Sequence, residues 1–310
     1  MRLPGQGRAQ ERRFRGEPAL ELSGGVISAV FTPALGMNGV SLRCRGVEHL
    51  ALPGGIDALR AGHTTGLPLL APWANRLAQR RYRAAGVQVD LSRQRLKVDG
   101  NGLPIHGLLV GKPGWTVERM TTRGDTARLH ASTEIDSRSF PFPHRIDLSV
   151  TVRDSRLRID TTIIPSSRRP VPASFGWHPY LTLPDAPRSS WRLRLPTRRH
   201  LALDARGIPT GAAALARREV GPIGRQTFDD LSALGRERRF AIENDAGRSV
   251  ELRCGTGYSF AQVWVPPGRS FAALEPMVAP TNALVEHKAP LVRRGEPFTA
   301  SFTLTLDQPA

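Results

Sequence analysis

The chain has 310 residues, 40% of them hydrophobic, which is enough to bury a substantial core. It contains 30 glycines and 26 prolines, so tight turns must be frequent and many short strands are favoured over long helices. The net charge of +17 comes from arginines scattered along the whole chain, with only three lysines among the 44 basic residues. Because the arginines form no stripe or cluster, this charge does not predict a dedicated nucleic-acid-binding protein.

The cysteines and the N-terminal segment bear on the expected cellular location of the protein. Cys44 and Cys254 lie far apart and belong to no CxxC or Cys/His spacing, so neither a disulfide framework nor a zinc site is indicated. Residues 1–15 are Arg-rich without the apolar core of a secretory signal, and no apolar run is long enough to span a membrane. We therefore expect a cytoplasmic protein, with an organellar transit peptide as the alternative reading of the N-terminus.

From residue 25 onward the hydrophobic pattern repeats every two residues, which is typical of strands with one buried face. In chain order we expect a short helical turn at 56–60, a hairpin at 146–163, a strand at 191–195, a second helical turn at 228–234, a hairpin at 240–252 and a long strand at 298–306. The predicted fold class is therefore all-β, as one large antiparallel β-sandwich domain over residues 18–306. Residues 1–17 are expected to form a flexible tail and residues 307–310 a short C-terminal one.

Several familiar catalytic motifs are absent from the sequence. It contains no GxSxG or GxGxxG, and the segment from Gly107 to Pro113 is one residue too short for a P-loop and has proline where a magnesium-binding hydroxyl should stand. The eight histidines show no HxH or HExxH spacing, so no metal site is predicted.

Polar residues remain in four segments rich in proline, glycine and aromatic residues, where turns and strand ends present side chains to a cleft. These segments are PWANR at 72–76, LPIHG at 103–107, SFGWHPY at 174–180 and FAALEPM at 271–277.

In this order, and with Asp229 between the last two segments, the motifs resemble those of the aldose 1-epimerase (galactose mutarotase) family, from about residue 25 to residue 306. The resemblance implies a galactose-mutarotase-like β-supersandwich that binds a free sugar in a cleft. It implies that His178 is the general acid and Glu275 the general base. It also implies that the following residues contact the sugar: Asn75, Arg76, His106 and Asp229, with the adjoining Asp230 as an alternative to Asp229.

Three tryptophans near these motifs have two readings. Trp73, Trp115 and Trp177 either pack on the apolar faces of a sugar or belong to the core. Trp73 and Trp177 also replace residues that are more often Phe or Tyr in the family, which bears on the shape of the pocket.

Exchange of α and β anomers requires opening the bond between C1 and the ring oxygen, and one base and one acid suffice for it. The implied function is therefore a cofactor-independent isomerase acting on a free hexose, with a small-molecule sugar as its partner. Two alternatives stay open: an epimerase of hexose 6-phosphates, which needs arginines around the phosphate, and a noncatalytic carbohydrate-binding protein. The sequence does not indicate an oligomeric state.

Overall fold

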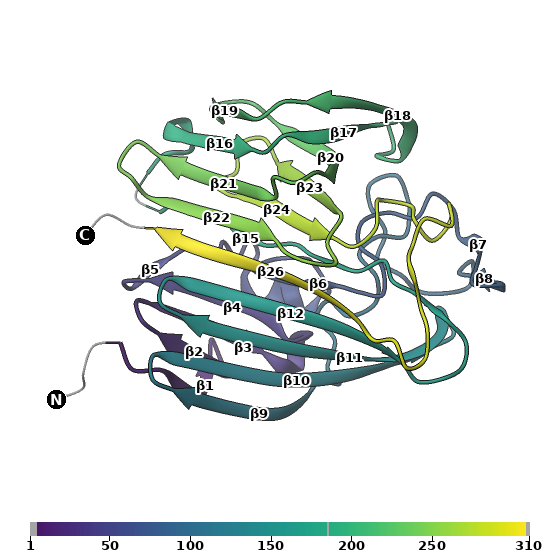
Figure 1. Cartoon of the computed structure of the whole chain (residues 1–310), viewed down its shortest axis with the longest axis horizontal. Helices are drawn as coiled ribbons and strands as arrows, with labels where there is room; N and C mark the ends of the chain where they lie inside the picture. Colours follow the sequence, from purple (N-terminus) through teal and green to yellow (C-terminus); the bar gives the residue numbers. More distant parts are fainter. Residues whose placement is uncertain (1–4, 185, 308–310) are drawn as a thin grey trace.

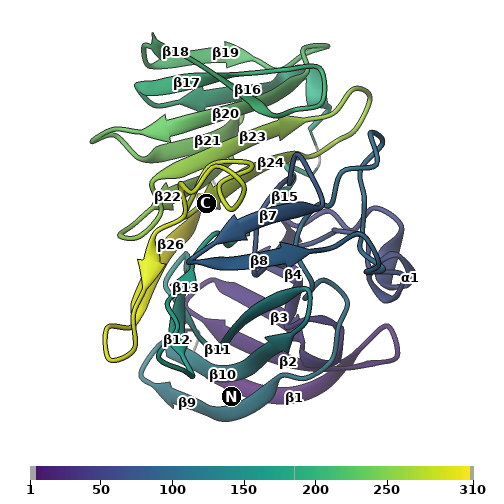
Figure 2. The same ribbon diagram turned by 90° about the vertical axis from the view of Figure 1, so that its right-hand side faces the viewer.

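The computed structural model describes residues 5–184 and 186–307 and confirms the all-β prediction. The nine-stranded sheet runs through the full height of the molecule in Figure 1, from β19 at the top to β9 at the bottom. Behind it lie a five-stranded sheet in the lower half and an eight-stranded sheet in the upper half. Figure 2 shows the same two halves from the side.

The nine-stranded sheet has the order β19-β16-β21-β22-β26-β12-β11-β10-β9. Its strands are β9 (Thr116–Arg123), β10 (Thr126–Ser137), β11 (Phe140–Arg153), β12 (Arg156–Pro165), β16 (Trp191–Leu195), β19 (Glu219–Pro222), β21 (Arg239–Asn244), β22 (Ser249–Cys254) and β26 (Phe298–Asp307). The five-stranded sheet runs in sequence order and comprises β1 (Arg8–Phe14), β2 (Glu17–Gly24), β3 (Ile27–Thr32), β4 (Asn38–Cys44) and β5 (Val47–Glu48).

The eight-stranded sheet has the order β18-β17-β20-β23-β24-β14-β6, with β15 also paired to β24. Its strands are β6 (Leu69–Leu70), β14 (Gly176–Trp177), β15 (Tyr180–Leu181), β17 (Arg198–Leu203), β18 (Pro209–Ala216), β20 (Phe228–Leu234), β23 (Phe260–Val265) and β24 (Ala272–Met277). The remaining elements are β7 (Arg81–Ala84) with β8 (Val87–Asp90), β13 (Val171–Pro172) with β25 (Leu291–Val292), helix α1 (Gly55–Arg60), and the 3-10 turns η1 (Pro33–Leu35) and η2 (Arg188–Ser190).

The hairpin of β11 and β12 shows how the alternating pattern forms the core. Every second side chain of β11 is buried, and Val150 lies opposite Ile159 across the ladder. Residues directly opposite each other point to the same face, so both side chains enter the core between the layers. The hairpins predicted at 146–163 and 240–252 and the strands at 191–195 and 298–306 are all confirmed.

Two expectations about local structure are wrong, and one is confirmed. Residues 228–234 form strand β20 instead of a helical turn, because β20 is paired on both sides, with β17 and with β23. The tail expected over residues 1–17 is too long, because β1 pairs with β2 along its whole length from Arg8. The short helix expected at 56–60 is present as α1. Residues 1–4 and 308–310 lie outside the described residues.

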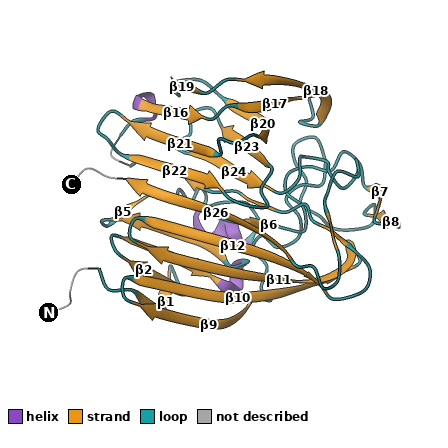
Figure 3. Cartoon of the chain, viewed as in Figure 1, coloured by secondary structure: helices purple, strands orange, loops and turns teal. Residues whose placement is uncertain are grey.

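One face of the eight-stranded sheet is available for a binding site, because the opposite face packs in the main hydrophobic core. Val263 of β23 and Leu274 of β24 point to the opposite face and belong to the main hydrophobic core. Long loops follow β6 and β8, and Figure 3 shows loops gathered on the right-hand side, beside β7 and β8. Within residues 5–184 and 186–307, no helix has the length and apolar character needed to cross a membrane.

Candidate active site

Four polar or aromatic side chains lie on one face of the eight-stranded sheet because of its register. Asp229 of β20 is opposite Trp264 of β23, and Gln262 of β23 is opposite Glu275 of β24. Since side chains alternate along a strand and opposite residues share a face, all four point the same way. Asp230 therefore points to the other face, where its carboxylate lies 3.6 Å from His200 Nε2. The register places Asp229 and not Asp230 on the side of Glu275.

His178 reaches the same face from a strand that is interrupted at a proline. Gly176 of β14 lies opposite Met277, and Tyr180 of β15 lies opposite Ala273, so both short strands keep one register against β24. His178 falls between them, opposite Glu275. Its Nε2 is 3.3 Å from Glu275 Oε1, and the two side chains are only 5% and 2% exposed. The predicted acid and base are thus in direct contact, although 97 residues separate them.

Asn75 and His106 come from two loops that are held against each other. The His106 backbone N–H donates to the Asn75 carbonyl at 3.0 Å, and Leu108 N–H donates to the Ala71 carbonyl at 2.7 Å. Asn75 and His106 both have a positive φ, of 57° and 63°. Such a conformation is uncommon for residues other than glycine and is concentrated at functional sites, where the surrounding structure maintains it.

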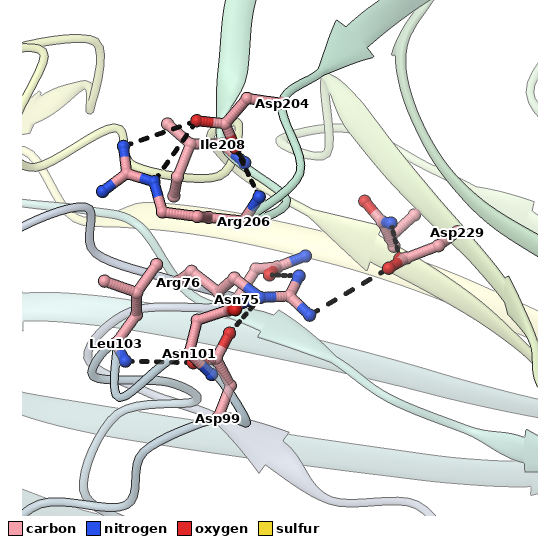
Figure 4. A network of polar contacts seen from close by, with 10 residues as sticks. Asn75, Arg76, Asp99, Asn101, Leu103, Asp204, Arg206, Ile208 and Asp229 are labelled. Atoms are coloured by element: carbon pink, nitrogen blue, oxygen red, sulfur yellow. Dashed lines mark hydrogen bonds and ion pairs between the residues drawn. The ribbon is translucent and has the colours of Figure 1, made fainter.

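Arg76 links the loop wall of the site to the sheet wall (Figure 4). Its Nε donates to Asp99 Oδ2 at 2.7 Å, and its Nη1 donates to Asn75 Oδ1 at 3.1 Å. Its Nη2 lies 4.0 Å from Asp229 Oδ2, while Gln262 Nε2 donates to Asp229 Oδ1 at 2.5 Å. The planar guanidinium is therefore held in one orientation before any ligand binds.

These side chains enclose one cavity of about 210 Å³. Ligand pockets for drug-sized molecules measure ~300–1,000 Å³, so this cavity suits a ligand of about one ring. Its lining contains all six residues predicted from the sequence, together with eight others. The full lining is Thr64, Asn75, Arg76, Lys97, Val98, Asp99, Ile105, His106, His178, Tyr180, Asp229, Gln262, Trp264 and Glu275.

Several polar atoms of these lining residues are buried without a hydrogen-bond partner among the described residues. They are Nδ1 of His106, Nδ1 of His178, Oε1 of Gln262 and Oε2 of Glu275. Buried polar atoms are nearly always hydrogen-bonded in native proteins, and leaving one unpaired costs about 1–3 kcal/mol. Four in one small cavity point to a ligand rich in hydrogen-bonding groups.

The charges of the central pair are controlled by burial. Burial, with the nearby charge of Asp229, raises the pKa of Glu275 well above its usual value, and Arg76 only partly opposes this. Burial and the charge of Lys97 lower the pKa of His178 to about 3. Burial therefore favours the uncharged form of each side chain, with a proton on the Glu275 carboxyl and His178 as a neutral imidazole. A base at Glu275 and an acid at His178 require that this proton moves between the two side chains, which the 3.3 Å contact permits.

This single shared proton predicts an unusual pH profile. We expect kcat/KM for the anomer exchange predicted from the sequence to fall as the pH rises through the raised pKa of Glu275, because the pair then has no proton to give. On the acid side a second proton must bind His178, whose pKa is about 3, so no loss is expected near the ordinary histidine value of about 6.5. Polarimetric rates from pH 4 to 10 test this, and an acid limb centred near 6.5 would contradict it.

The aromatic residues at the cavity differ from those expected. Trp73 and Trp177 are fully buried in the core, and Trp115 packs against it, so the core reading of these three side chains is the right one. Tyr180 instead stacks on the His178 ring at 4.5 Å, and Trp264 meets the same ring edge-on at 5.6 Å. The sequence did not point to Trp264. Its orientation depends on how β23 pairs with β20 and β24, and the sequence of one strand does not show its pairing partners.

Asp99 was also missed, although the sequence carries a signal for it. It opens the segment Asp-Gly-Asn-Gly, and an aspartate at the start of a turn commonly accepts from backbone N–H groups further on. Asp99 Oδ1 accepts from Asn101 N at 2.9 Å and from Leu103 N at 3.0 Å, which leaves Oδ2 for Arg76. One carboxylate thus fixes both the turn and the guanidinium.

Replacing Asp99 by Asn should therefore weaken sugar binding without removing the acid or the base. The amide oxygen can still accept from the turn, but the charge-assisted bond to Arg76 is lost, which is worth about 1.5–3 kcal/mol. We expect KM to rise roughly tenfold or more while kcat changes much less. Steady-state polarimetry measures the two constants separately. A fall in kcat of about tenfold with an unchanged KM would contradict the role of Asp99 in positioning Arg76.

The profile of the aldose 1-epimerase family matches residues 56–305, most of the chain. The chain belongs to the aldose 1-epimerase family. The match spans both loops and all the strands that line the cavity of this family member. No curated protein matches it significantly by sequence.

Solved structures show that the epimerase-family fold continues to the N-terminal strands. A galactose mutarotase-like protein from Clostridium acetobutylicum aligns with a TM-score of 0.83 and 18% identity, covering 98% of this chain and 99% of that one. A protein from Synechocystis sp. PCC 6803 gives 0.75 and 20%, covering 100% and 99%, and a galactose 1-epimerase from Lactobacillus acidophilus gives 0.76 and 11%, covering 99% and 100%. At these identities the likeness shows the fold alone, and it confirms the predicted galactose-mutarotase-like architecture.

Proposed function

We propose that this protein interconverts the α and β anomers of an aldose, with Glu275 as general base and His178 as general acid. The observation that carries the proposal is the buried contact between these two side chains in a cavity that holds four unpaired polar atoms. An acid and a base on one substrate are what ring opening requires. Membership of the aldose 1-epimerase family supports the same reaction.

In the first half of the reaction, the Glu275 carboxylate takes the proton from the hydroxyl on C1. The electrons of that O–H bond form the carbonyl, the bond between C1 and the ring oxygen breaks, and His178 gives its proton to the ring oxygen. The open-chain aldehyde turns about the bond between C1 and C2. Closure on the other face reverses both proton transfers and restores the pair, so no proton or electron is gained or lost overall.

The other polar side chains are proposed to hold the ring in place during this exchange. Arg76 and Asn75 offer N–H donors, Asp229 accepts from hydroxyls, and His106 can do either with its free Nδ1. Burial and neighbouring positive charges lower the pKa of His106 well below its usual value, so the imidazole is neutral at physiological pH. We propose it as a hydroxyl-binding residue and not as a second acid.

Polarimetry of freshly dissolved α-glucose and α-galactose tests the proposed activity directly. The protein should speed the approach to anomeric equilibrium in proportion to its concentration. A noncatalytic carbohydrate-binding protein would bind these sugars in a calorimeter but leave the rate unchanged, and that result would contradict the proposal. We also propose a cytoplasmic location, which cell fractionation would test.

A further inference from the structure

A second cavity, of about 490 Å³, lies on the nine-stranded sheet, where β16 and β22 end and β21 begins, in the upper half of Figure 1. It shares no lining residue with the cavity that contains Glu275, which lies against the eight-stranded sheet. Arginines that are scattered in the sequence come together here. Half of the lining residues are arginines, namely Arg194, Arg218, Arg236, Arg238, Arg239 and Arg253.

The register of the sheet directs three of these arginines to the outside. Arg194 of β16, Arg239 of β21 and Arg253 of β22 are each followed by a residue of the main hydrophobic core, so by alternation the arginines point away from the core. Arg239 lies directly opposite Arg253 in the ladder between β21 and β22. Like charges placed directly opposite each other destabilise a sheet, and an anion between them would offset that cost.

Arg238 is a cation that the backbone holds in place. Its Nε donates to the Gly235 carbonyl at 3.1 Å, and its Nη1 donates to the carbonyls of Gly255 and Tyr258 at 3.1 and 3.3 Å. Its Nη2 donates to no group within residues 5–184 and 186–307. The partly buried guanidinium is therefore fixed by neutral carbonyl groups, and one pair of N–H donors is unused.

The charges around the cavity do not balance. Arg194 and Arg239 share Glu251, at 3.2 and 3.3 Å. The other four arginines make no ion pair with a carboxylate of the described residues: Arg218, Arg236, Arg238 and Arg253. The lining contains one glutamate and no aspartate, so the four unpaired arginines leave an excess of three positive charges.

We propose that this cavity binds an oligophosphate chain of two or three phosphates, the group shared by inorganic triphosphate and nucleoside triphosphates. Arginine forks bind phosphate oxygens in pairs. One phosphate group carries only about −1.5 to −2 charges at neutral pH, so a single phosphate would leave part of the excess unbalanced. No aromatic residue lines the cavity to stack on a base, so the phosphate chain is the part that would be recognised. The site is separate from the proposed anomer exchange and does not depend on it.

Calorimetric titration of the full chain at physiological ionic strength tests this site, because charges more than about 8 Å away are then largely screened. Inorganic triphosphate should bind with a Kd at least about tenfold lower than that of orthophosphate, the effect of one additional charge-assisted hydrogen bond. Replacing both Arg236 and Arg253 by Gln should raise the Kd for triphosphate at least about tenfold. Both side chains are exposed, so the variant should fold normally.

The matched control is the double variant Arg83→Gln with Arg128→Gln. It removes the same number of charges from exposed positions of β7 and β10, outside the cavity, and should change the Kd less than about twofold. Equal weakening in both double variants would show attraction to the net charge alone and would overturn the site. Equal affinity for triphosphate and orthophosphate would overturn the oligophosphate chain as its ligand.

Two further titrations identify the source of the chain and its place. ATP that binds more tightly than inorganic triphosphate identifies a nucleoside triphosphate as the ligand, and ATP that binds equally or less tightly identifies the chain alone; both results support the inference. Glu275→Gln should leave the Kd for triphosphate unchanged, because Glu275 lines the other cavity. A Kd that changes in this variant, or triphosphate that is displaced by glucose, would place the anion in the cavity of Glu275 and overturn the inference.

Discussion

Replacing Glu275 by Gln should lower kcat/KM for anomer exchange by about 10²–10⁴-fold, the usual contribution of one positioned proton-transfer group. Glutamine has nearly the same shape and can keep the contact with His178, but its amide cannot take the proton from the C1 hydroxyl. The buried carboxyl is the only one within hydrogen-bond reach of the His178 ring among the described residues. Polarimetry at substrate concentrations far below KM measures the effect.

Glu237→Gln provides a matched control for the Glu275 variant. Glu237 is exposed in the loop before β21 and does not line the cavity that contains Glu275, so the same chemical change there should leave kcat/KM within about twofold. The Glu275 variant should unfold at about the same urea concentration as the native protein, since an uncharged amide replaces a buried carboxyl whose raised pKa favours its uncharged form. A folded Glu275→Gln protein that keeps a tenth or more of the activity would remove Glu275 from the role of base.

The fold could be predicted as far as it depends on local patterns. Strands such as β11 and β12 carry the two-residue alternation within themselves, because each has one face in the core. β20 does not, since its segment FDDLSAL places two carboxylates together and its conformation is set by ladders to β17 and β23. β1 likewise exists only through its pairing with β2.

The residues of the candidate site likewise differ in whether local sequence patterns could reveal them. Residues next to turn-forming glycines and prolines, such as His106 and His178, stand out in the sequence because the turn itself is local. Gln262 and Trp264 lie inside a strand, and only the register of β23 against β24 turns them toward the cavity. The choice between Asp229 and Asp230 has the same cause, because a shift of one residue in β20 would exchange their faces.

Replacing Gly107 by Ala should destabilise the protein by more than about 3 kcal/mol and disturb the site, because two costs add. Gly107 has a φ of 68°, a conformation that costs a residue with a side chain about 1–2 kcal/mol. A Cβ at this position would also lie 2.2 Å from the Ala71 carbonyl oxygen and 2.4 Å from the carbonyl carbon, so the backbone of one loop must move. Urea unfolding measures the loss of stability, and polarimetry measures the accompanying loss of activity.

Gly102→Ala separates these two costs. Gly102 lies in the same long loop with a φ of 75°, but nothing is within 4 Å of the position that its Cβ would occupy. It should therefore lose only about 1–2 kcal/mol, and the difference between the two variants measures the close approach of Gly107 to Ala71. The close approach of Gly107 to Ala71 holds His106 next to the other loop. Asn75 and Arg76 lie a few residues further along that loop. Equal losses in both variants would show that the His-Gly pair serves backbone conformation alone; a larger loss in Gly107→Ala, with reduced activity, would show that the glycine lets the two binding loops meet.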